Sequence, residues 1–177
     1  MCIRDRDYAS FYHNYKGKRY RHDQVHNLFG YYMTRSASEA FERYVPEKRI
    51  LLFSRASYIG MHRFGGIWQG DNASWWSHLK MNVKMMPSLN MCGFLYTGAD
   101  VGGFGADATE DLVLRWLEFA VFTPLLRNHS ARGTRRQEVY RFSHVEKFAD
   151  VIGVRYQILP YIYSEYMKAA LRNTMMF

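Results

Sequence analysis

Charged and aromatic side chains follow four apolar segments of this sequence, at the point where each segment ends. They are Arg55, Asp71, Asp100, Arg127 and His129, with Trp68 just before Asp71. A carboxyl group can transfer protons in catalysis, and guanidinium and imidazole groups make directional hydrogen bonds to hydroxyls. An indole can cover the apolar face of a sugar ring. If these side chains meet in one pocket, the pocket suits a neutral, polyhydroxylated ligand.

The four apolar segments have the length of β-strands and alternate with helix-period segments. The predicted strands cover residues 49–54, 64–70, 90–98 and 120–126. Their nearly continuous apolar character is typical of parallel strands that are covered on both faces, which indicates the α/β class. In a parallel α/β barrel, residues after the strands all point into one mouth. A closed barrel needs eight strands and about 250 residues, so the four strands predict a partial TIM (β/α)8 barrel.

The predicted helices lie between and around these strands. They cover residues 25–44, 73–86, a segment from about 107 to 120, and a segment that starts at 143. Pro87 should end the second helix, and Pro160 should kink or divide the last one. Capping-box spacing starts the third helix at Asp107 and the fourth at Ser143. The third helix places four apolar residues on one face: Leu112, Trp116, Phe119 and Ala120.

The composition limits the possible partners. The 177 residues are 48% hydrophobic and 23% charged, which is typical of a globular domain. The net charge of +8 is scattered rather than gathered in a basic patch, so we expect no nucleic-acid partner. Cys2 and Cys92 cannot form a framework of several disulfides, and a cytoplasmic location fits best. No signal peptide or apolar run of membrane-spanning length is evident, so no membrane partner is expected.

Four long motifs carry the functional signal. They are HNLFG, LFSRASYIGMHRFGGIWQGDNASWW, NMCGFLYTGADVGGF and RWLEFAVFTPLLRNHSARGTRRQE. In order and spacing they resemble glycoside hydrolase family 31, from about Asp7 to Phe177. The resemblance implies a retaining α-glycosidase of the α-glucosidase type on a TIM barrel, of which this chain would hold roughly strands five to eight. The implied substrate is an α-linked glucoside of a short oligosaccharide, and we expect no cofactor.

The resemblance also implies roles for individual residues. Asp71, in WQGDN, matches the general acid/base, and Trp68 matches an aromatic wall beside the bound sugar. Arg55 and His129 match groups that hydrogen-bond the sugar in the subsite where cleavage begins. The remaining matches are pocket-lining positions: Asp100, Phe104 and Arg127.

A retaining mechanism needs two carboxyl groups about 5 to 5.5 Å apart, one as the nucleophile and one as the acid/base. As the acid, Asp71 must be protonated near neutral pH, which burial and a negative nucleophile opposite it would favour. A guanidinium beside it would oppose protonation. We therefore expect Arg55 to direct its hydrogen bonds mainly to sugar hydroxyls.

The nucleophile of the family is an aspartate in a motif like Trp-x-Asp-Met-Asn-Glu, and this sequence has no such motif. Residues 1–6 resemble a translated sequencing-adapter remnant and are expected to be non-native. Residues 7–177 are then interpreted as the C-terminal half of a catalytic barrel, truncated at both ends, and this piece alone is predicted to be inactive. The alternative function is a non-catalytic fragment or a sugar-binding pseudoenzyme.

Structural interpretations compete at two of the carboxylates. Asp71 could cap the helix that begins near Ala73, which is a common use of Gly-Asp-Asn. Asp100 could be an ordinary turn residue in TGADVGGFG. From the residues alone, both interpretations remain open.

Other residues favour structural roles. His22 and His26, in HDQVH, imitate a zinc-protease motif, but aspartate replaces the required glutamate and no third ligand is evident, so no metal site is predicted. Three tryptophans outside the predicted site, Trp75, Trp76 and Trp116, are expected to pack in the core. Cys92 is interpreted as a small buried residue.

Overall fold

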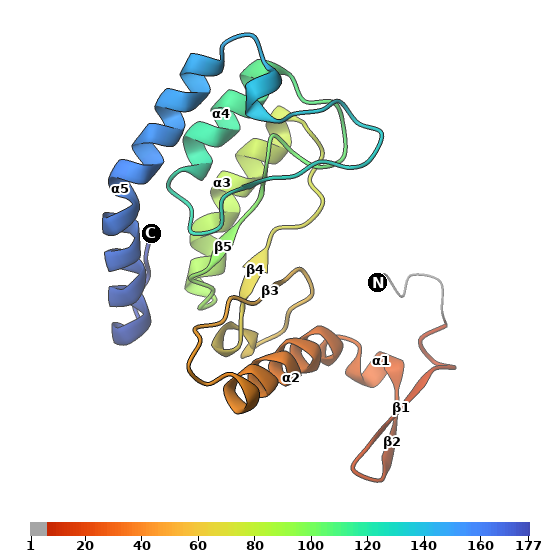
Figure 1. Ribbon diagram of the computed structural model, residues 1–177. Helices are drawn as coiled ribbons and strands as arrows, with labels where there is room; N and C mark the ends of the chain where they lie inside the picture. The colour runs from red at the N-terminus through yellow and green to blue at the C-terminus, as the bar shows by residue number, and fades with distance from the viewer. Residues whose placement is uncertain (1–6) are drawn as a thin grey trace.

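The computed structural model describes residues 7–177 (Figure 1). The segment predicted to be non-native, residues 1–6, lies outside the described residues. Figure 1 shows the helices packed around a small set of parallel strands, with an N-terminal hairpin projecting from one end. Of the helices formed by these residues, none is long and apolar enough to cross a membrane.

An antiparallel hairpin, β1 (Tyr12–Tyr15) and β2 (Lys18–Arg21), begins the described chain. Lys16 and Gly17 between the strands both have positive φ, which a two-residue turn of type I′ requires. Two helices follow at once, α1 (His22–Val25) and α2 (Leu28–Tyr44). The predicted helix over 25–44 is confirmed from Leu28 onward, and it ends at Tyr44 as predicted.

Five short strands form the parallel part of the fold: β3 (Phe53–Ser54), β4 (Gly66–Trp68), β5 (Thr97–Gly98), β6 (Asp100–Val101) and β7 (Arg127–Asn128). β4 lies between β3 and β5, and β6 pairs with β7, all in parallel. Only Ala99 separates β5 from β6, so residues 97–101 pair with β4 at one end and with β7 at the other. The four strand segments therefore lie in sequence order.

Helices connect these parallel strands. The elements are α3 (Trp76–Met91), α4 (Glu110–Ala120) and α5 (Val145–Arg172), with 3-10 turns η1 (Met61–Arg63) and η2 (Val139–Arg141). α3 joins β4 to β5, and α4 joins β6 to β7. A helix that links two parallel neighbours makes a βαβ unit, the repeating unit of α/β folds. The predicted α/β class is confirmed.

The core lies between α4, the strand segment 97–101 and α5. Leu112, Trp116 and Ala120 of α4 are buried, and Phe119 packs against the same cluster, as its predicted apolar face requires. The cluster also contains Ala99, Val101 and Phe148. Burying a large apolar side chain contributes roughly 1.5–3 kcal/mol to folding, so this cluster fixes the strands against the helices.

Pro87 does not end α3, contrary to the prediction. The helix continues for another turn and closes where Gly93 has φ +89° and Phe94 N–H donates to the Leu89 carbonyl at 3.0 Å, a Schellman motif. Pro87 removes only the hydrogen bond to the carbonyl of Val83, which lies on the exposed face of the helix. The predicted strand over 90–98 is therefore confirmed only at its end.

Pro160 does not divide α5, which runs as one helix past it. Its missing N–H would have bonded to the carbonyl of Tyr156, a residue that faces solvent. On an exposed side, water can satisfy a carbonyl that a proline leaves unpaired, so a proline there costs the helix less than it would in the core.

The predicted strand over 120–126 is wrong. Ala120 ends α4, residues 121–126 form turns, and the strand begins only at Arg127. The side-chain hydroxyl of Thr123 is within hydrogen-bond distance of the carbonyls of Ala120 and Leu125, at 2.9 and 2.8 Å, which stabilises the turn. The apolar run here reflects burial, because buried turns and buried strands have the same composition.

The two predicted capping boxes are also wrong. Thr109 caps α4, since its side-chain oxygen accepts the N–H three residues further on at 3.2 Å. The carboxylate of Glu110 accepts instead from the backbone N–H groups of Ser143 and His144, at 3.2 and 2.8 Å. Asp107 accepts from the backbone N–H of Arg135. Tertiary hydrogen bonds thus replaced the local ones that the spacing suggested.

Gly98 tests the close packing of the strands. A Cβ atom there would overlap the backbone carbonyl of Leu125, so Gly98→Ala should lower the free energy of unfolding by about 1–3 kcal/mol. Gly153→Ala is the control, because Gly153 lies in α5 with open space around it, and this change should raise stability by about 0.5–1 kcal/mol. Urea unfolding of both variants measures the difference. Equal effects would contradict the packing.

Candidate functional site

Arg55 and Asp71 form an ion pair just beyond the ends of β3 and β4. The Arg55 Nη1 donates to Asp71 Oδ2 at 2.9 Å, and both side chains are close to half exposed. Gly70 has φ +93°, and a Cβ there would lie 3.1 Å from the Arg55 side chain. The glycine therefore leaves room for Arg55 to reach the carboxylate.

This contact differs from the expectation for Arg55, whose hydrogen bonds were to go mainly to sugar hydroxyls. The side chain of Asp71 is 44% exposed, so residues 7–177 do not supply the burial expected of it either. The structure instead pairs the Asp71 carboxylate with a guanidinium at the surface.

Asp100 and Arg127 form a second, deeper ion pair. The Arg127 Nε donates to Asp100 Oδ1 at 2.6 Å, and the Asp100 side chain is fully buried. Burial raises the pKa of Asp100, and the Arg127 guanidinium opposes this rise. The second carboxylate oxygen of Asp100 has no hydrogen-bond partner among residues 7–177. Arg127 is thus the main group that offsets the cost of burying this charge.

Trp68 lies between the two ion pairs. The Arg55 guanidinium is 5.6 Å from the centre of the indole, and the Arg127 guanidinium is 4.9 Å from it. Both distances are in the range of cation–π attraction. The aromatic side chain therefore connects the two pairs into one continuous surface.

Phe104 and His129 complete the predicted set. Their rings stack with centroids 5.2 Å apart and an interplanar angle of 29°. His129 is near enough to Asp100 to oppose the rise of its pKa. The structure therefore brings all seven predicted residues into one set of neighbouring contacts at the carboxyl ends of the parallel strands.

Asn72 and Ser74 anchor the loop that carries Asp71, and the sequence assigned neither residue a role. The carbonyl of Asn72 accepts from the backbone N–H groups of Phe104 and Gly105, at 2.6 and 3.0 Å, and the side chain of Ser74 donates to the Ala106 carbonyl at 2.8 Å. Both residues are buried. The loop after β4, which carries Asp71, is thereby fixed to the loop after β6.

Gly103 explains why these two loops come so close. It has φ +84°, and a Cβ there would lie 2.6 Å from the backbone of Ser74. A residue with a side chain would need both a rare backbone conformation and a shift of the neighbouring loop. The second glycine of the GGF motif therefore allows the loop that carries Phe104 to approach the backbone of Ser74.

Gln137 is a further positioning residue that the sequence did not reveal. Its side-chain nitrogen donates to the carbonyls of Val101 and Gly103, both at 3.0 Å, and its backbone carbonyl accepts from the Asn128 side chain at 2.7 Å. The side chain is buried. Its place in the RRQE motif was the only available signal, and a buried glutamine between two loops cannot be identified without the fold.

The capping interpretation of Asp71 is wrong, and the turn interpretation of Asp100 holds only for its backbone. Asp71 does not cap α3, because that helix begins after Trp75 with no side-chain cap, and the N–H of Ala73 bonds instead to His78 Nδ1 at 2.8 Å. Asp100 is part of a turn through its backbone, but its carboxylate is committed to Arg127. Neither carboxylate is used for local capping.

The core assignment was correct for Trp116, which is fully buried, and wrong for Trp75 and Trp76, which are 58% and 52% exposed. Both lie at the outward start of α3, and Trp75 rests edge-on against the ring of His78 at 5.1 Å. Cys92 is also exposed rather than buried. Composition alone could not distinguish the start of a helix from its packed middle.

His22 and His26 bond to each other rather than pointing to a common centre. His26 Nδ1 lies 2.9 Å from His22 Nε2, and His22 Nδ1 lies 2.7 Å from His13 Nε2. Within residues 7–177, no three His, Cys, Asp or Glu side chains are placed to hold a metal ion. The three imidazoles form a chain of hydrogen bonds instead.

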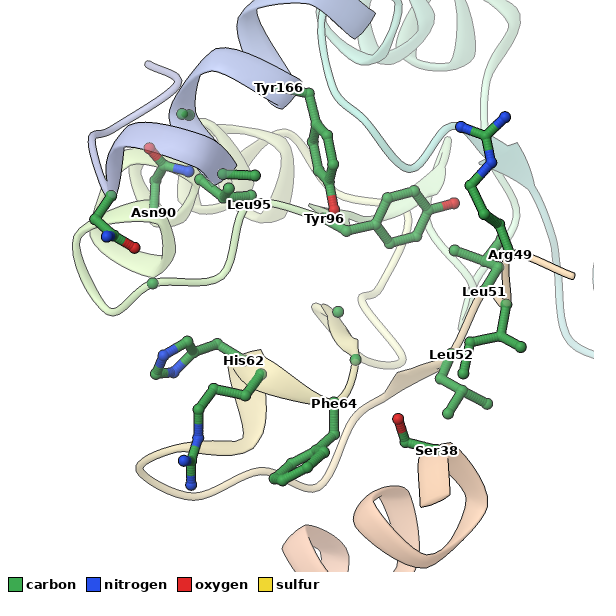
Figure 2. A pocket seen from close by; sticks show the side chains of 18 of the residues that line it. Ser38, Arg49, Leu51, Leu52, His62, Phe64, Asn90, Leu95, Tyr96 and Tyr166 are labelled. Carbon is green, nitrogen blue, oxygen red and sulfur yellow. The ribbon is translucent and has the colours of Figure 1, made fainter. Parts of the chain in front are cut away.

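A cavity of about 840 Å³ lies at the other ends of the strands (Figure 2). Leu52 precedes β3, Phe64 precedes β4 and Tyr96 precedes β5, and Tyr166 of α5 lies on the same cavity wall as Tyr96. The predicted site residues instead end β4 or follow β3, β4 and β5, and Arg127 pairs with Asp100 across β6 and β7. The cavity is therefore separate from the seven predicted residues, which we call the charged set: Arg55, Trp68, Asp71, Asp100, Phe104, Arg127 and His129. Its position opposite the carboxyl ends of the strands argues against a catalytic role.

Parallel strands joined by helices, with charged and aromatic groups beyond the strands, define an α/β protein and are typical of TIM barrels. Residues 2–165 match the family model described as "Glycosyl hydrolases family 31 TIM-barrel domain". The chain belongs to glycoside hydrolase family 31 and is similar to its α-glucosidases.

Relatives of known name agree with this assignment. The chain is 36% identical to "Alpha-glucosidase 2" of Bacillus thermoamyloliquefaciens over 161 residues, which cover 89% of this chain and 20% of that protein. It is 35% identical to "Neutral alpha-glucosidase AB" of Dictyostelium discoideum, covering 87% of this chain and 17% of the relative. The chain thus spans about a fifth of the length of these proteins.

Solved structures show the same relation. The α subunit of glucosidase II, in a DNJ-bound form, matches with a TM-score of 0.82 and 33% identity, over 88% of this chain and 17% of that one. A family 31 α-glucosidase from Bacteroides thetaiotaomicron matches with a TM-score of 0.77 and 35% identity, over 86% and 26%. The α/β TIM-barrel fold is therefore common to all of them.

Arg127→Met should destabilise the protein because it leaves the Asp100 carboxylate buried without its partner. We expect a loss of roughly 3 kcal/mol at pH 7, measured by urea unfolding. Without the guanidinium, the pKa of Asp100 should rise further, so below this pKa the carboxyl is neutral in the folded protein and the loss should shrink at pH 4.

The control is Arg115→Met, which removes an exposed arginine paired with Glu118 and Asp111. It should cost at most about 1 kcal/mol. A loss for Arg127→Met that is equally small, or that does not change with pH, would contradict the role of the buried pair.

Proposed function

We propose that this chain supplies roughly strands five to eight of a family 31 barrel, the C-terminal half of a catalytic domain. Four parallel strand segments in sequence order support this, because a closed barrel needs eight. The short span of the relatives that the chain covers supports it as well. In this proposal the remaining strands close the barrel around the charged set.

We further propose that the whole protein is a retaining α-glucosidase and that Asp71 is its general acid/base. The contact that supports this best is the Arg55–Asp71 ion pair beside Trp68, at the open ends of the strands. Among the described carboxylates of the set, Asp71 is the one that solvent and substrate can reach, whereas Asp100 is buried and paired. An acid/base must reach the glycosidic oxygen, and only Asp71 satisfies that condition.

In the first step, protonated Asp71 would donate its proton to the leaving oxygen while a nucleophilic carboxylate from the rest of the protein attacks the anomeric carbon. The glycosidic bond breaks and a glycosyl-enzyme ester forms. In the second step, Asp71 as a carboxylate takes a proton from water, which attacks the anomeric carbon and releases the nucleophile.

Asp71 must be free to approach the glycosidic oxygen. We propose that sugar hydroxyls take over the hydrogen bonds of Arg55 when substrate binds, so that the Asp71 carboxyl can turn toward the substrate. Trp68 would cover the sugar ring, and His129, stacked on Phe104, would donate to a hydroxyl. Asp100 and Arg127 would line the pocket and fix its base.

The proposed substrates are α-linked glucosides of short oligosaccharides. Several relatives carry the name α-glucosidase, and two plant relatives are named as probable glucan 1,3-alpha-glucosidases. Charged side chains that are paired with one another, beside one indole, offer directional hydrogen bonds to the hydroxyls of a neutral sugar. A cytoplasmic location stays a prediction from the low cysteine content.

Asp71→Asn in the full-length protein should lower turnover of an unactivated disaccharide by at least about 100-fold, because the leaving oxygen is no longer protonated. An aryl α-glucoside with an acidic leaving group should suffer less, since this group departs without a proton. Steady-state kinetics on both substrates measure the difference. Asp150→Asn, an exposed substitution on α5, is the matched control. Disaccharide turnover within a few-fold of wild type would refute the assignment.

The 177-residue chain alone should show no hydrolysis, because the proposed nucleophile lies outside it. Release of a chromogenic aglycone from an aryl α-glucoside is a sensitive assay for this. Robust turnover by the purified chain would show that its own carboxylates are sufficient, and would overturn the proposed division of the two catalytic groups.

The alternative is a sugar-binding protein without catalysis. The observation that supports it is the lack of a Trp-x-Asp-Met-Asn-Glu motif in this sequence. If the full-length protein bound maltose but hydrolysed neither substrate, this alternative would replace the enzyme.

A further inference from the structure

A cavity of about 270 Å³ lies where the N-terminal segment, α1 and the loop after β3 meet. Its lining combines two tyrosine rings with four polar side chains: Tyr8, Tyr58, Asp23, Gln24, His26 and Asn27. The volume is slightly below the roughly 300–1,000 Å³ of typical ligand pockets, which suits a single ring. None of these residues belongs to the charged set around Asp71.

His26 is oriented by a chain of imidazoles whose middle member, His22, is buried. Its Nδ1 bonds to His22 Nε2 at 2.9 Å, and His22 Nδ1 bonds to His13 Nε2 at 2.7 Å. His22 is fully buried, and burial lowers its pKa, which favours a neutral ring that donates from one nitrogen and accepts at the other. With Nδ1 committed to this chain, Nε2 is the nitrogen of His26 that can bond to a ligand.

Tyr8 and Tyr58 supply the apolar faces of the cavity. The Tyr8 ring stacks on His26 with centroids 4.7 Å apart and an interplanar angle of 26°. Both tyrosines remain about 40% exposed. Aromatic rings that are held in place and still open to solvent can stack on the apolar face of a sugar.

The charges of the cavity favour a neutral ligand. Asp23 is neutralised by Arg21, which donates to its two carboxylate oxygens at 3.1 and 2.6 Å. The oxygen of the Gln24 side chain accepts the backbone N–H of Arg21 at 3.0 Å, which leaves its amide nitrogen to donate. The lining contains no lysine or arginine, so no permanently charged cation in it favours an anionic ligand. A cation would meet a carboxylate that is already paired.

The loop after β3 links this cavity to the candidate site. Tyr58 lies three residues beyond Arg55 on that loop. Gly30 of α2 packs so closely on Ala56 that a Cβ there would lie 2.7 Å from it. The backbone between Arg55 and Tyr58 is therefore packed against the start of α2 at Ala56.

We infer that the cavity formed by Tyr8, Tyr58 and His26 is a second carbohydrate site, which binds one glucosyl unit of a neutral, α-linked oligosaccharide. It is an addition to the pocket around Asp71 and takes part in binding rather than in bond cleavage. The inference rests on the proposed substrate class but not on the proposed chemistry.

The test uses the full-length protein with Asp71→Asn, so that substrate is bound but not consumed. Isothermal titration with a linear α-linked gluco-oligosaccharide should show two binding sites. Adding Tyr58→Ala should weaken one of them at least about tenfold, equivalent to about 1.4 kcal/mol, and leave the other. Tyr58→Phe keeps the ring and should keep both sites within about threefold. Tyr156→Ala, an exposed tyrosine of α5, is the matched control.

Asn27→Ala provides a second variant if Tyr58→Ala does not fold, because the Asn27 side chain is exposed and makes no helix-cap bond. It should weaken the same site. One binding site in the parent protein, or two sites that neither Tyr58→Ala nor Asn27→Ala weakens, would overturn the inference. Hydrolysis of an aryl α-glucoside by the protein with Asp71 intact tests the proposed function separately, so the two failures are distinguishable.

Discussion

The fully buried carboxylate of Asp100 has one strong partner, Arg127, at 2.6 Å, and the geometry of the site depends on this pair. It joins the paired first residues of β6 and β7, and it places the Arg127 guanidinium 4.9 Å from the centre of the Trp68 indole. A buried charge without a partner is costly, so neither side chain can turn away freely. The position of the Arg127 guanidinium against Trp68 follows from this constraint.

The Arg55–Asp71 pair differs from the Asp100–Arg127 pair in its exposure to solvent. Arg55 and Asp71 are both close to half exposed, and an ion pair in water is worth little, typically about 0–1 kcal/mol. Such a pair can exchange its partners for sugar hydroxyls at a small cost in free energy, whereas the buried Asp100–Arg127 pair cannot. The same two residue types thus supply a fixed base and an adaptable surface, and the depth of burial decides which is which.

Backbone contacts between loops hold these side chains in place. The carbonyl of Asn72 accepts two N–H groups of the loop that carries Phe104, and Gly103 allows the approach because it lacks a side chain. Gln137 bonds to the carbonyl of Gly103 from the other side. The buried polar groups of Asn72 and Gln137 thus form hydrogen bonds that fix the loops. Aromatic and charged side chains of the same loops are left to contact a ligand.

From the sequence alone, the α/β class, the family and the seven residues of the charged set could be predicted, because motifs and polar side chains after strands are local signals. The ends of several elements could not, since Pro87, Glu110 and the apolar run after Ala120 fit more than one local structure. Only the tertiary structure decided that Asp100 is buried and Asp71 open, and that Gln137 lies beneath the site. Burial and pairing join residues far apart in the chain, which no local pattern records.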